Sequence, residues 1–373
     1  MPRLDPLRAD LDGLASRGRL RTLAPRAGRD FASNDYLALA ASRRIAGAVA
    51  RALDNGVAIG SGGSRLLRGN HPEHEALEAE AARFFGSEAA LFFSTGFAAN
   101  ACLFATVPQR GDLVVYDALS HASVHEGLRL ARAAHRPFGH NDAQAANDAI
   151  AVWRAEGGTG TPWIAVESLY SMDGDRAPIA DLAAVARRHD AMLVIDEAHA
   201  TGVFGENGRG LAADLPPGNR VTLHTCGKAL GCEGALLACP GLVGDFLVNR
   251  GRAFIFSTAP SPLLAVAVQE ALAILADGPE RRERLHALIA HAECALARCG
   301  VAPTGSQILP LVLGDDARAM AVAMRLQEAG LDVRGIRPPT VPAGTARLRL
   351  SLTLNVTPAD IDALAAALAE ALA

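Results

Sequence analysis

The sequence contains few cysteines, and they follow no pattern that would bind a metal or build a disulfide framework. The six cysteines are scattered along 373 residues, at Cys102, Cys226, Cys232, Cys239, Cys294 and Cys299. They include no CxxC pair and no spacing typical of a zinc finger. We therefore expect reduced thiols in the core of a cytoplasmic protein, and no metal site built from cysteine.

An excess of positive charge is also missing, and so is any long apolar segment. The chain has 36 basic and 40 acidic residues and a formal net charge of −4, which does not suit a partner such as nucleic acid. No run reaches the roughly 20 apolar residues of a membrane-spanning helix. The N-terminal segment mixes Arg and Asp with Leu at helical spacing, unlike a signal peptide. We expect a soluble protein without a nucleic-acid or membrane partner.

Between about residues 45 and 260, β-rich runs alternate with Ala/Leu-rich stretches. The β-rich runs are ALFF, DLVVYD, WIAVES, AMLVID, VTLHTC and GALLACP. This alternation predicts βα units, and therefore an α/β fold with a mostly parallel central sheet covered by helices on both faces. We expect residues 45–260 to form this large domain.

Beyond residue 260 the pattern changes. One long helix is predicted from about 262 to 299, followed by the strand LPLVLG, a further helix and the alternating strand ARLRLSLTLN. This order predicts a smaller α+β C-terminal domain, residues 261–373. Residues 1–44 are too few to fold alone, so we expect an N-terminal arm that packs on the small domain or covers the active site.

A carboxylate, an imidazole and an amine stand at predicted turns of the large domain. The strand AMLVID ends in Asp196, and His199 follows three residues later. Ligands of α/β folds bind at this edge of the sheet, although Asp and His at this spacing could also form a metal site or a helix cap.

Lys228 follows the strand VTLHTC among small residues, which favours a desolvated amine over a solvated surface charge. It lacks the GxxxxGK[ST] frame of a phosphate loop.

A third segment, ALFFSTGFAAN, predicts a strand that turns through Ser94, Thr95 and Gly96 into an apolar helix. Free backbone N–H groups at a helix start can bind a phosphate, although an ordinary capped helix has the same pattern. In combination, the three segments suit pyridoxal phosphate. A lysine binds its aldehyde, a carboxylate keeps its ring nitrogen protonated, and a helix start holds its phosphate.

Two other motifs allow a functional and a structural interpretation. His71 and His74 in NHPEHEALE could indicate a metal site, but the proline and acidic residues between and after them mark a helix start, and no third ligand is evident. Gly60, Gly62 and Gly63 in GSGGSR resemble a nucleotide loop without the GxGxxG frame. We expect a helix start and a tight turn beside the substrate entrance.

Eight strings connect these segments to a known family: GSGGSR, FSTGFAAN, DALSHAS, ESLYSMDGD, IDEAHATG, HTCGKALG, FIFSTA and RPPTVPAGTARLRL. They occur in the family's order, and the match extends from SNDYL at Ser33 to Leu350. The chain thereby resembles the α-oxoamine synthase family of fold-type I, or aspartate-aminotransferase-like, pyridoxal-phosphate enzymes. The resemblance implies that fold and that cofactor.

The resemblance also implies residue roles. Lys228 would bind the cofactor covalently, Asp196 would pair with the ring nitrogen, and His121 would stack on the ring. The phosphate or the phenolic oxygen would be contacted by Gly96, Phe97, Ser171, His199 and Thr225, and the partner subunit's phosphate in a homodimer by Ser257 and Thr258. The substrate would be contacted by Arg21, Asn34, His121, Thr340 and Arg349. Arg349 is the expected clamp for the amino-acid carboxylate, although Arg347 shares its face of the strand.

The implied reaction is a decarboxylative condensation of L-alanine with pimeloyl-CoA, or with pimeloyl on an acyl carrier protein, in biotin biosynthesis. The string RPPTVPAGTARLRL favours this branch. A sister reaction with glycine and acetyl-CoA is the nearest alternative, and an aminotransferase on the same fold is a further one. A binding or regulatory module without catalysis would have lost Lys228 or Asp196.

Overall fold

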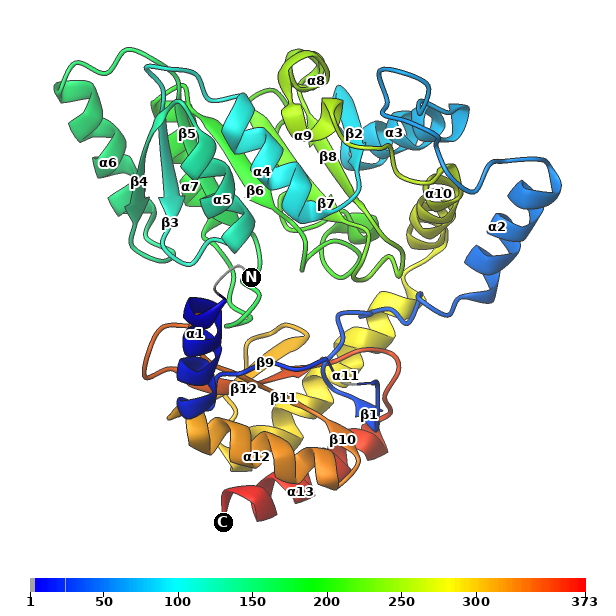
Figure 1. Ribbon diagram of the computed structural model, residues 1–373, viewed down its shortest axis with the longest axis vertical. Coiled ribbons are helices and arrows are strands. Elements are labelled where there is room, and N and C mark those ends of the chain that lie inside the picture. The colour runs from blue at the N-terminus through cyan, green and yellow to red at the C-terminus, as the bar shows by residue number, and fades with distance from the viewer. Residues whose placement is uncertain (1–3, 24) are drawn as a thin grey trace. The chain divides into compact units, whose positions relative to one another are not determined.

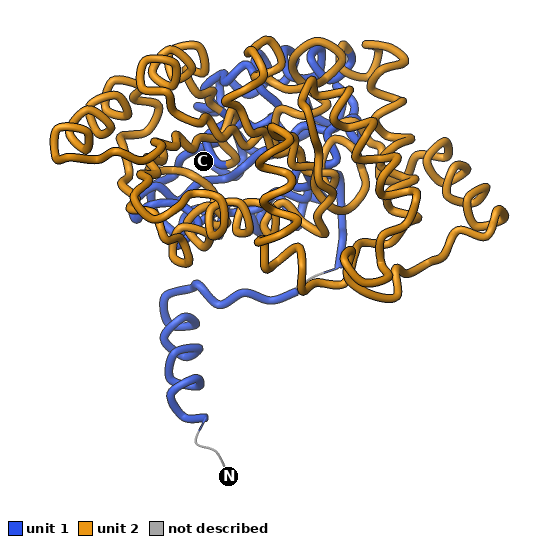
Figure 2. Tube along the Cα trace, turned by 90° about the horizontal axis from the view of Figure 1, so that it is seen from above, with its two compact units in different colours: residues 1–36, 172–174, 284–373 blue, residues 37–171, 175–283 orange. Residues whose placement is uncertain are grey.

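The computed structural model describes residues 4–23 and 25–373, which form two compact units. Unit 2 comprises residues 37–171 and 175–283, and unit 1 comprises the residues up to 36 together with 172–174 and 284–373 (Figure 2). The chain therefore leaves unit 2 for three residues after Ser171 and then returns to it. The predicted division at residues 44/45 and 260/261 stays a prediction.

The centre of unit 2 is a seven-stranded sheet with the order β2-β8-β7-β6-β5-β3-β4 (Figure 1). Strand β8 runs antiparallel to β2 and β7, and the remaining neighbours are parallel. The predicted fold-type I architecture with a mostly parallel sheet is confirmed. The strands are β2 Ala89–Phe93, β3 Leu113–Asp117, β4 Ala134–Phe138, β5 Pro162–Glu167, β6 Met192–Asp196, β7 Arg220–Thr225 and β8 Ala235–Cys239.

Apolar residues on both faces of this sheet explain why helices cover it on two sides. In β5, Trp163 and Ala165 pack into one core cluster, whereas Ile164 and Val166 pack into another. Successive strand residues point to opposite faces, so an uninterrupted apolar strand needs cover on both. The helices of unit 2 are α2 Arg43–Asp54, α3 Pro72–Phe85, α4 Gly96–Thr106, α5 Ala122–Leu130, α6 Ala143–Ala155, α7 Ile179–Arg188, α8 Gly241–Arg250, α9 Arg252–Ile255 and α10 Pro262–Asp277, with a 3₁₀ turn η1 at Glu206–Gly208.

The single long helix predicted from about 262 to 299 is wrong. Helix α10 ends at Asp277, and a separate helix α11 begins at Glu280. Pro279 causes the break, because proline has no backbone N–H and disfavours a helical conformation in the residue before it. Gly278 is accordingly extended, with φ 173° and ψ 165°.

Unit 1 contains an antiparallel three-stranded sheet with the order β11-β12-β9. Every residue of β12 is buried, including Arg347 and Arg349 of its alternating sequence ARLRLS. A short strand near the N-terminus, β1, pairs in parallel with β10 of the C-terminal part. The elements are α1 Asp5–Ser16, β1 Arg29–Asp30, α11 Glu280–Leu296, η2 Ala297–Cys299, β9 Ile308–Gly314, α12 Asp316–Glu328, β10 Leu331–Asp332, β11 Arg334–Ile336, β12 Ala346–Ser351 and α13 Pro358–Leu372.

Within residues 4–23 and 25–373, no single helix combines the length and the apolar composition needed to cross a membrane. One bent pair, α10 with the helical stretch Glu280–Cys299, meets that criterion jointly, by length and composition only.

Candidate active site

Lys228 lies in the loop between β7 and β8, beside a histidine from the loop after β6. Its Nζ atom is 2.8 Å from Nε2 of His199. Lys228 is also the only lysine in the 373-residue sequence, so every other basic side chain apart from histidine is an arginine. The amine predicted to bind the cofactor therefore has an imidazole within hydrogen-bonding distance, and no second lysine could take over its chemistry.

Asp196 ends strand β6 at the carboxyl edge of the parallel strands and is 8% exposed. Its Oδ1 accepts a hydrogen bond from the Ala198 backbone N–H at 2.9 Å. Its Oδ2 accepts one from the Asn100 side-chain Nδ2 at 2.8 Å. Both carboxylate oxygens are thus held in place, which fixes the direction in which the charge is presented.

His121 caps the start of helix α5 and belongs to the same cluster. Its Nδ1 atom is 2.8 Å from Ser123 Oγ and accepts the Ser123 backbone N–H at 3.2 Å. The Ser123 hydroxyl also accepts a hydrogen bond from Asn100 Nδ2 at 3.0 Å. Burial lowers the pKa of His121, repulsion from Lys228 lowers it further, and attraction to Asp196 opposes both effects.

The start of helix α4 approaches the end of strand β7 so closely that only glycine fits. A Cβ atom on Gly96 would lie 2.6 Å from Cγ2 of Thr225. Thr95 caps the helix by accepting the Ala98 N–H at 3.0 Å. The N–H groups of Gly96 and Phe97, the first two helical residues, have no carbonyl inside the helix to bond with, so they can bind an anion. The structure thus brings Gly96 and Thr225 together.

Ser171 lies in the loop after β5, where its backbone N–H donates to Glu167 Oε2 at 3.3 Å. Glu167 ends β5 and pairs in register with Asp196 of β6. Burial raises the pKa of Glu167 to about 8, and the neighbouring Asp196 charge contributes, whereas Lys228 acts in the opposite direction. A second buried carboxyl group therefore stands beside Asp196.

Three residues of this cluster were not predicted from the sequence: Asn100, Ser123 and Glu167. A partial signal existed for each of them. Asn100 lies four residues after Gly96 on the same helix, and Ser123 lies two residues after His121. Glu167 ends an apolar strand, as Asp196 does.

Ser257 and Thr258 lie in the segment before α10, which is tied to the GSGGSR turn. Thr258 forms an isolated β-bridge with Ser64, and the Ala259 N–H donates to the Gly63 carbonyl at 2.9 Å. Ser257 and Thr258 are both exposed, and with Ser94 of the turn before α4 they line a small pocket. Their predicted role in a partner subunit's site stays a prediction.

Four of the five predicted substrate residues, all except His121, belong to unit 1, where they form two pairs. Arg349 is 6% exposed, and its guanidinium donates to Asn34 Oδ1 at 3.1 Å and to Ser351 Oγ at 2.5 Å. Arg21 donates to Thr340 Oγ1 at 3.1 Å near the surface. The neighbouring Arg347 is ion-paired with Asp173. The two arginines of this strand therefore have different partners: Arg347 is ion-paired with a carboxylate, and Arg349 is oriented by Asn34 and Ser351.

His71 and His74 serve the structure of helix α3. They form a reciprocal capping box around Pro72, and His74 Nε2 lies 2.8 Å from the Pro260 carbonyl oxygen. Across the described part of the chain, no group of three or more His, Cys, Asp or Glu side chains is arranged to hold a metal ion.

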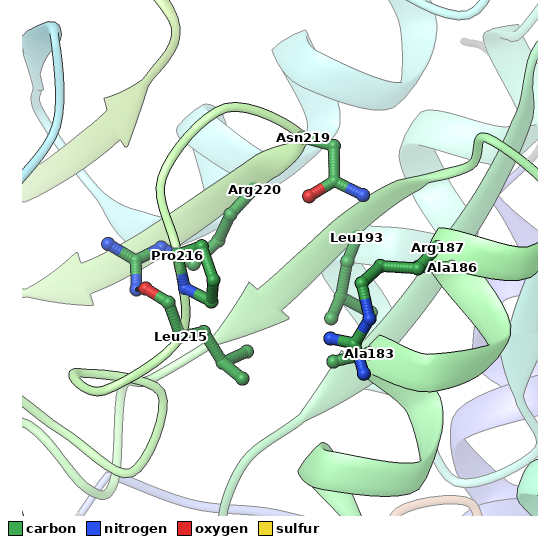
Figure 3. Close-up of a pocket in the computed structure, with 8 residues that line it drawn as sticks. All are labelled: Ala183, Ala186, Arg187, Leu193, Leu215, Pro216, Asn219 and Arg220. Atoms are coloured by element: carbon green, nitrogen blue, oxygen red, sulfur yellow. Dashed lines mark hydrogen bonds between the residues drawn. The ribbon is translucent and has the colours of Figure 1, made fainter.

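A small pocket of about 60 Å³ lies elsewhere in unit 2 (Figure 3). Its volume suits one or two water molecules and is far below the several hundred Å³ of typical cofactor sites. None of the predicted site residues lines it. The lining residues are Ala183, Ala186, Arg187, Leu193, Leu215, Pro216, Asn219 and Arg220.

Comparison with known proteins adds independent information. A family model described as aminotransferase class I and II matches residues 28–368. The 8-amino-7-oxononanoate synthase of Anaeromyxobacter dehalogenans (strain 2CP-1) is 43% identical, covering 99% of this chain and 96% of that protein. The protein of the same name from Azoarcus sp. (strain BH72) is 42% identical, covering 96% and 95%.

Solved structures agree with these sequence relationships. A serine palmitoyltransferase from S. paucimobilis with a bound PLP–myriocin aldimine superimposes with a TM-score of 0.89 at 28% identity, covering 99% of this chain and 97% of that one. An 8-amino-7-oxononanoate synthase from Francisella tularensis gives a TM-score of 0.77 at 26% identity, covering 92% and 98%.

Proposed function

Because the chain belongs to the aminotransferase class I and II family and, within it, to the α-oxoamine synthases, we propose that it condenses L-alanine with a pimeloyl thioester. The products are 8-amino-7-oxononanoate, carbon dioxide and the free thiol of the acyl carrier, a step of biotin biosynthesis. The observation that carries this proposal is the 42–43% identity to curated 8-amino-7-oxononanoate synthases along nearly the whole chain.

Residues of unit 2 fit pyridoxal phosphate as the cofactor. Lys228 supplies the amine that binds the cofactor's aldehyde, and Asp196 supplies a fixed carboxylate for the ring nitrogen. The N–H groups of Gly96 and Phe97, with the Thr225 hydroxyl, are suited to the phosphate, and the missing side chain at Gly96 keeps this corner open. We assign the hydroxyl of Ser171 and the imidazole of His199 to the phenolic oxygen.

When bound, pyridoxal phosphate supplies an electron-withdrawing ring that stabilises negative charge at the substrate Cα. The Lys228 amine would remove the Cα proton of the substrate, and the neighbouring His199 imidazole would keep the amine in position. Asp196 would hold the proton on the ring nitrogen by accepting its hydrogen bond. His121 would orient the substrate.

Arg349 is the residue we assign to the carboxylate of the amino acid. Its planar guanidinium can bind a carboxylate through two parallel hydrogen bonds. Asn34 and Ser351 hold the side chain in a fixed orientation. We assign Arg21 and Thr340, which are hydrogen-bonded to each other, to contacts with the acyl substrate.

A thiol-release assay separates this function from its alternatives. Purified enzyme is offered each of three pairs: L-alanine with pimeloyl-CoA, glycine with acetyl-CoA, and L-serine with palmitoyl-CoA. The last pair is chosen because serine palmitoyltransferases superimpose well on this chain. We expect kcat/KM to be highest for the first pair by at least about 10²-fold, since each mismatched group costs about 1–3 kcal/mol of transition-state binding. Equal or higher activity with another pair would refute the assignment, and keto-acid formation without thiol release would indicate an aminotransferase.

The same assay compares the acyl carriers, with pimeloyl-CoA and pimeloyl attached to an acyl carrier protein as parallel substrates. We propose that either thioester is accepted, because the reacting carbonyl is identical in both.

Lys228 offers a second, sharper test because it is the only lysine of the chain. Borohydride reduction of the cofactor-loaded enzyme should add one pyridoxyl group per chain, located on the peptide that contains Lys228. Lys228→Ala should lose this label and lower kcat by at least about 10³-fold. Lys228→Arg keeps the positive charge but has no primary amine, and it should lose both as well. A label on the Lys228→Ala protein would contradict the assignment.

We also propose that the chain acts as a homodimer in which Ser257 and Thr258 contribute to the partner's phosphate site. Large apolar side chains near this segment support the proposal: Ile59 is 75% exposed, Leu67 84% and Phe256 72%. Exposed apolar clusters of this kind mark surfaces that a protein partner covers.

A further inference from the structure

A buried chain of hydrogen bonds connects Asp196 to His121 through two side chains that carry no assigned role. Asn100 Nδ2 lies 2.8 Å from Asp196 Oδ2 and 3.0 Å from Ser123 Oγ. Ser123 Oγ lies 2.8 Å from His121 Nδ1. Asn100 is 1% exposed and Ser123 is fully buried, so water does not compete for these contacts.

The direction of each hydrogen bond follows from the groups themselves. An ionised carboxylate only accepts, so the Asn100 amide must turn its NH₂ group toward Asp196. The opposite orientation would place the amide oxygen against the carboxylate. This orientation leaves the Oδ1 atom of Asn100 buried without a hydrogen-bond partner among the described residues. Because an amide nitrogen only donates, Ser123 Oγ is the acceptor in the next link.

Two donors then converge on Nδ1 of His121. The Ser123 hydroxyl accepts from Asn100 and has one hydrogen left, which points to His121 Nδ1. The Ser123 backbone N–H, which cannot reverse its role, also donates to Nδ1 at 3.2 Å. A hydrogen on Nδ1 would face this N–H directly. Nδ1 is therefore an acceptor, and the hydrogen of the neutral ring is on Nε2.

We propose that Asn100 and Ser123 are positioning residues that hold His121 as the neutral tautomer with its hydrogen on Nε2, and that they link this state to the charge of Asp196. The proposal deepens the assigned reaction and rests on it. His121 then offers one hydrogen-bond donor and no basic lone pair, which suits a negatively charged or carbonyl oxygen of the substrate. Removal of the Cα proton is left to Lys228.

Nuclear magnetic resonance of histidine nitrogens tests the proposal without turnover. The protein is labelled with ¹⁵N-histidine and titrated with and without pyridoxal phosphate, and His121→Asn identifies the His121 signals. We expect an unprotonated Nδ1 and a protonated Nε2 at neutral pH. Ser123→Ala removes the hydroxyl donor, so the pKa of His121 should rise by about 1 and both tautomers should appear.

Asn100→Leu should have a similar effect, because the Ser123 hydroxyl then becomes free to accept from His121. If the Leu variant does not fold, Asn100→Asp replaces it with a side chain of the same shape that repels Asp196. The matched control is Ser120→Ala. Ser120 is the residue before His121, is 7% exposed, and its hydroxyl has no partner within the described chain. This control should leave the His121 signals unchanged.

A protonated Nδ1 in the unsubstituted protein would overturn the proposal. So would Ser123 and Asn100 variants whose His121 pKa and tautomer match those of Ser120→Ala. These outcomes are read from the resonances of the protein itself, so they are distinct from a failure to form 8-amino-7-oxononanoate. Kinetics add a second reading, since loss of the tautomer should lower kcat in the Ser123→Ala enzyme by about 10-fold or more while cofactor labelling of Lys228 persists.

Discussion

At the scale of single residues, Glu167 shows how burial changes the charge of a side chain. The residue is 4% exposed, and burial together with Asp196 raises its pKa from 4.5 to about 8. The folded chain therefore retains a proton at pH values where the unfolded chain releases it. The stability contributed by this group is complete below the unfolded pKa and is lost as the pH rises through the folded pKa.

Replacing Glu167 with glutamine, which is neutral at every pH, should remove this dependence. We expect the Tm of the cofactor-free Glu167→Gln protein to fall less than that of the parent between about pH 5 and about pH 9, by several degrees. Thermal unfolding followed across this range provides the measurement. Glu156→Gln is the control, because Glu156 is an exposed glutamate at the surface. Parallel curves for the parent and Glu167→Gln would show that Glu167 does not titrate in this range.

Sequence reasoning at this scale can single out residues whose place in a recognisable element is clear. Asp196 ends strand β6 and Lys228 follows strand β7 closely, so a pattern of a few residues is enough to propose them. Asn100 reaches Asp196 across 96 positions of sequence, and Ser123 reaches Asn100 across 23. No local pattern contains such contacts, because they arise only when βα units lie side by side.

At the scale of elements, the close approach of helix α4 to strand β7 leads to a test of the phosphate site. Gly96→Ala places a Cβ atom 2.6 Å from Thr225 Cγ2, which the packing cannot accept without moving the helix start. We expect weaker binding of pyridoxal phosphate and about 1–3 kcal/mol lower stability. Fluorescence titration of the cofactor and denaturant unfolding measure the two effects.

Thr225→Ser in the same protein removes the Cγ2 methyl while keeping the hydroxyl, so the double variant should recover much of both losses. Gly47→Ala is a suitable control, because its Cβ would meet only the end of the Arg51 side chain at 3.5 Å in helix α2. If Gly96→Ala binds the cofactor as tightly as Gly47→Ala does, the helix start is not the phosphate site.

Elements were predicted well where they are buried and poorly where they are exposed or interrupted. The six predicted β-rich runs all lie in the sheet of unit 2. The remaining strand, β4, has the sequence AHRPF and lies at the edge of the sheet, where polar residues and proline are tolerated. The interruption of the helix after Asp277 depends on one Gly-Pro pair within an otherwise helical composition.

At the scale of the whole molecule, a homodimer predicts that two inactive variants restore each other. One variant carries Lys228→Ala, and the other carries Ser257→Ala with Thr258→Val. In a mixed dimer, one site combines the intact Lys228 of one subunit with the intact Ser257 and Thr258 of the other. Random reassociation makes half of the dimers mixed, with one working site in each, so activity should reach about a quarter of that of the parent enzyme.

The decisive comparison uses a mixture that cannot produce an intact site. Lys228→Ala mixed with Lys228→Arg forms dimers just as readily, yet it should stay inactive because every site lacks the amine. Both mixtures are unfolded and refolded together, and thiol release is measured at a limiting concentration of pyridoxal phosphate, where the loss of phosphate contacts matters most. If the first mixture shows only the sum of its separate components, each site is complete within one chain. Ser257 and Thr258 would then serve the turn that they form with Ser64, and the exposed side chains of Ile59, Leu67 and Phe256 would need another partner.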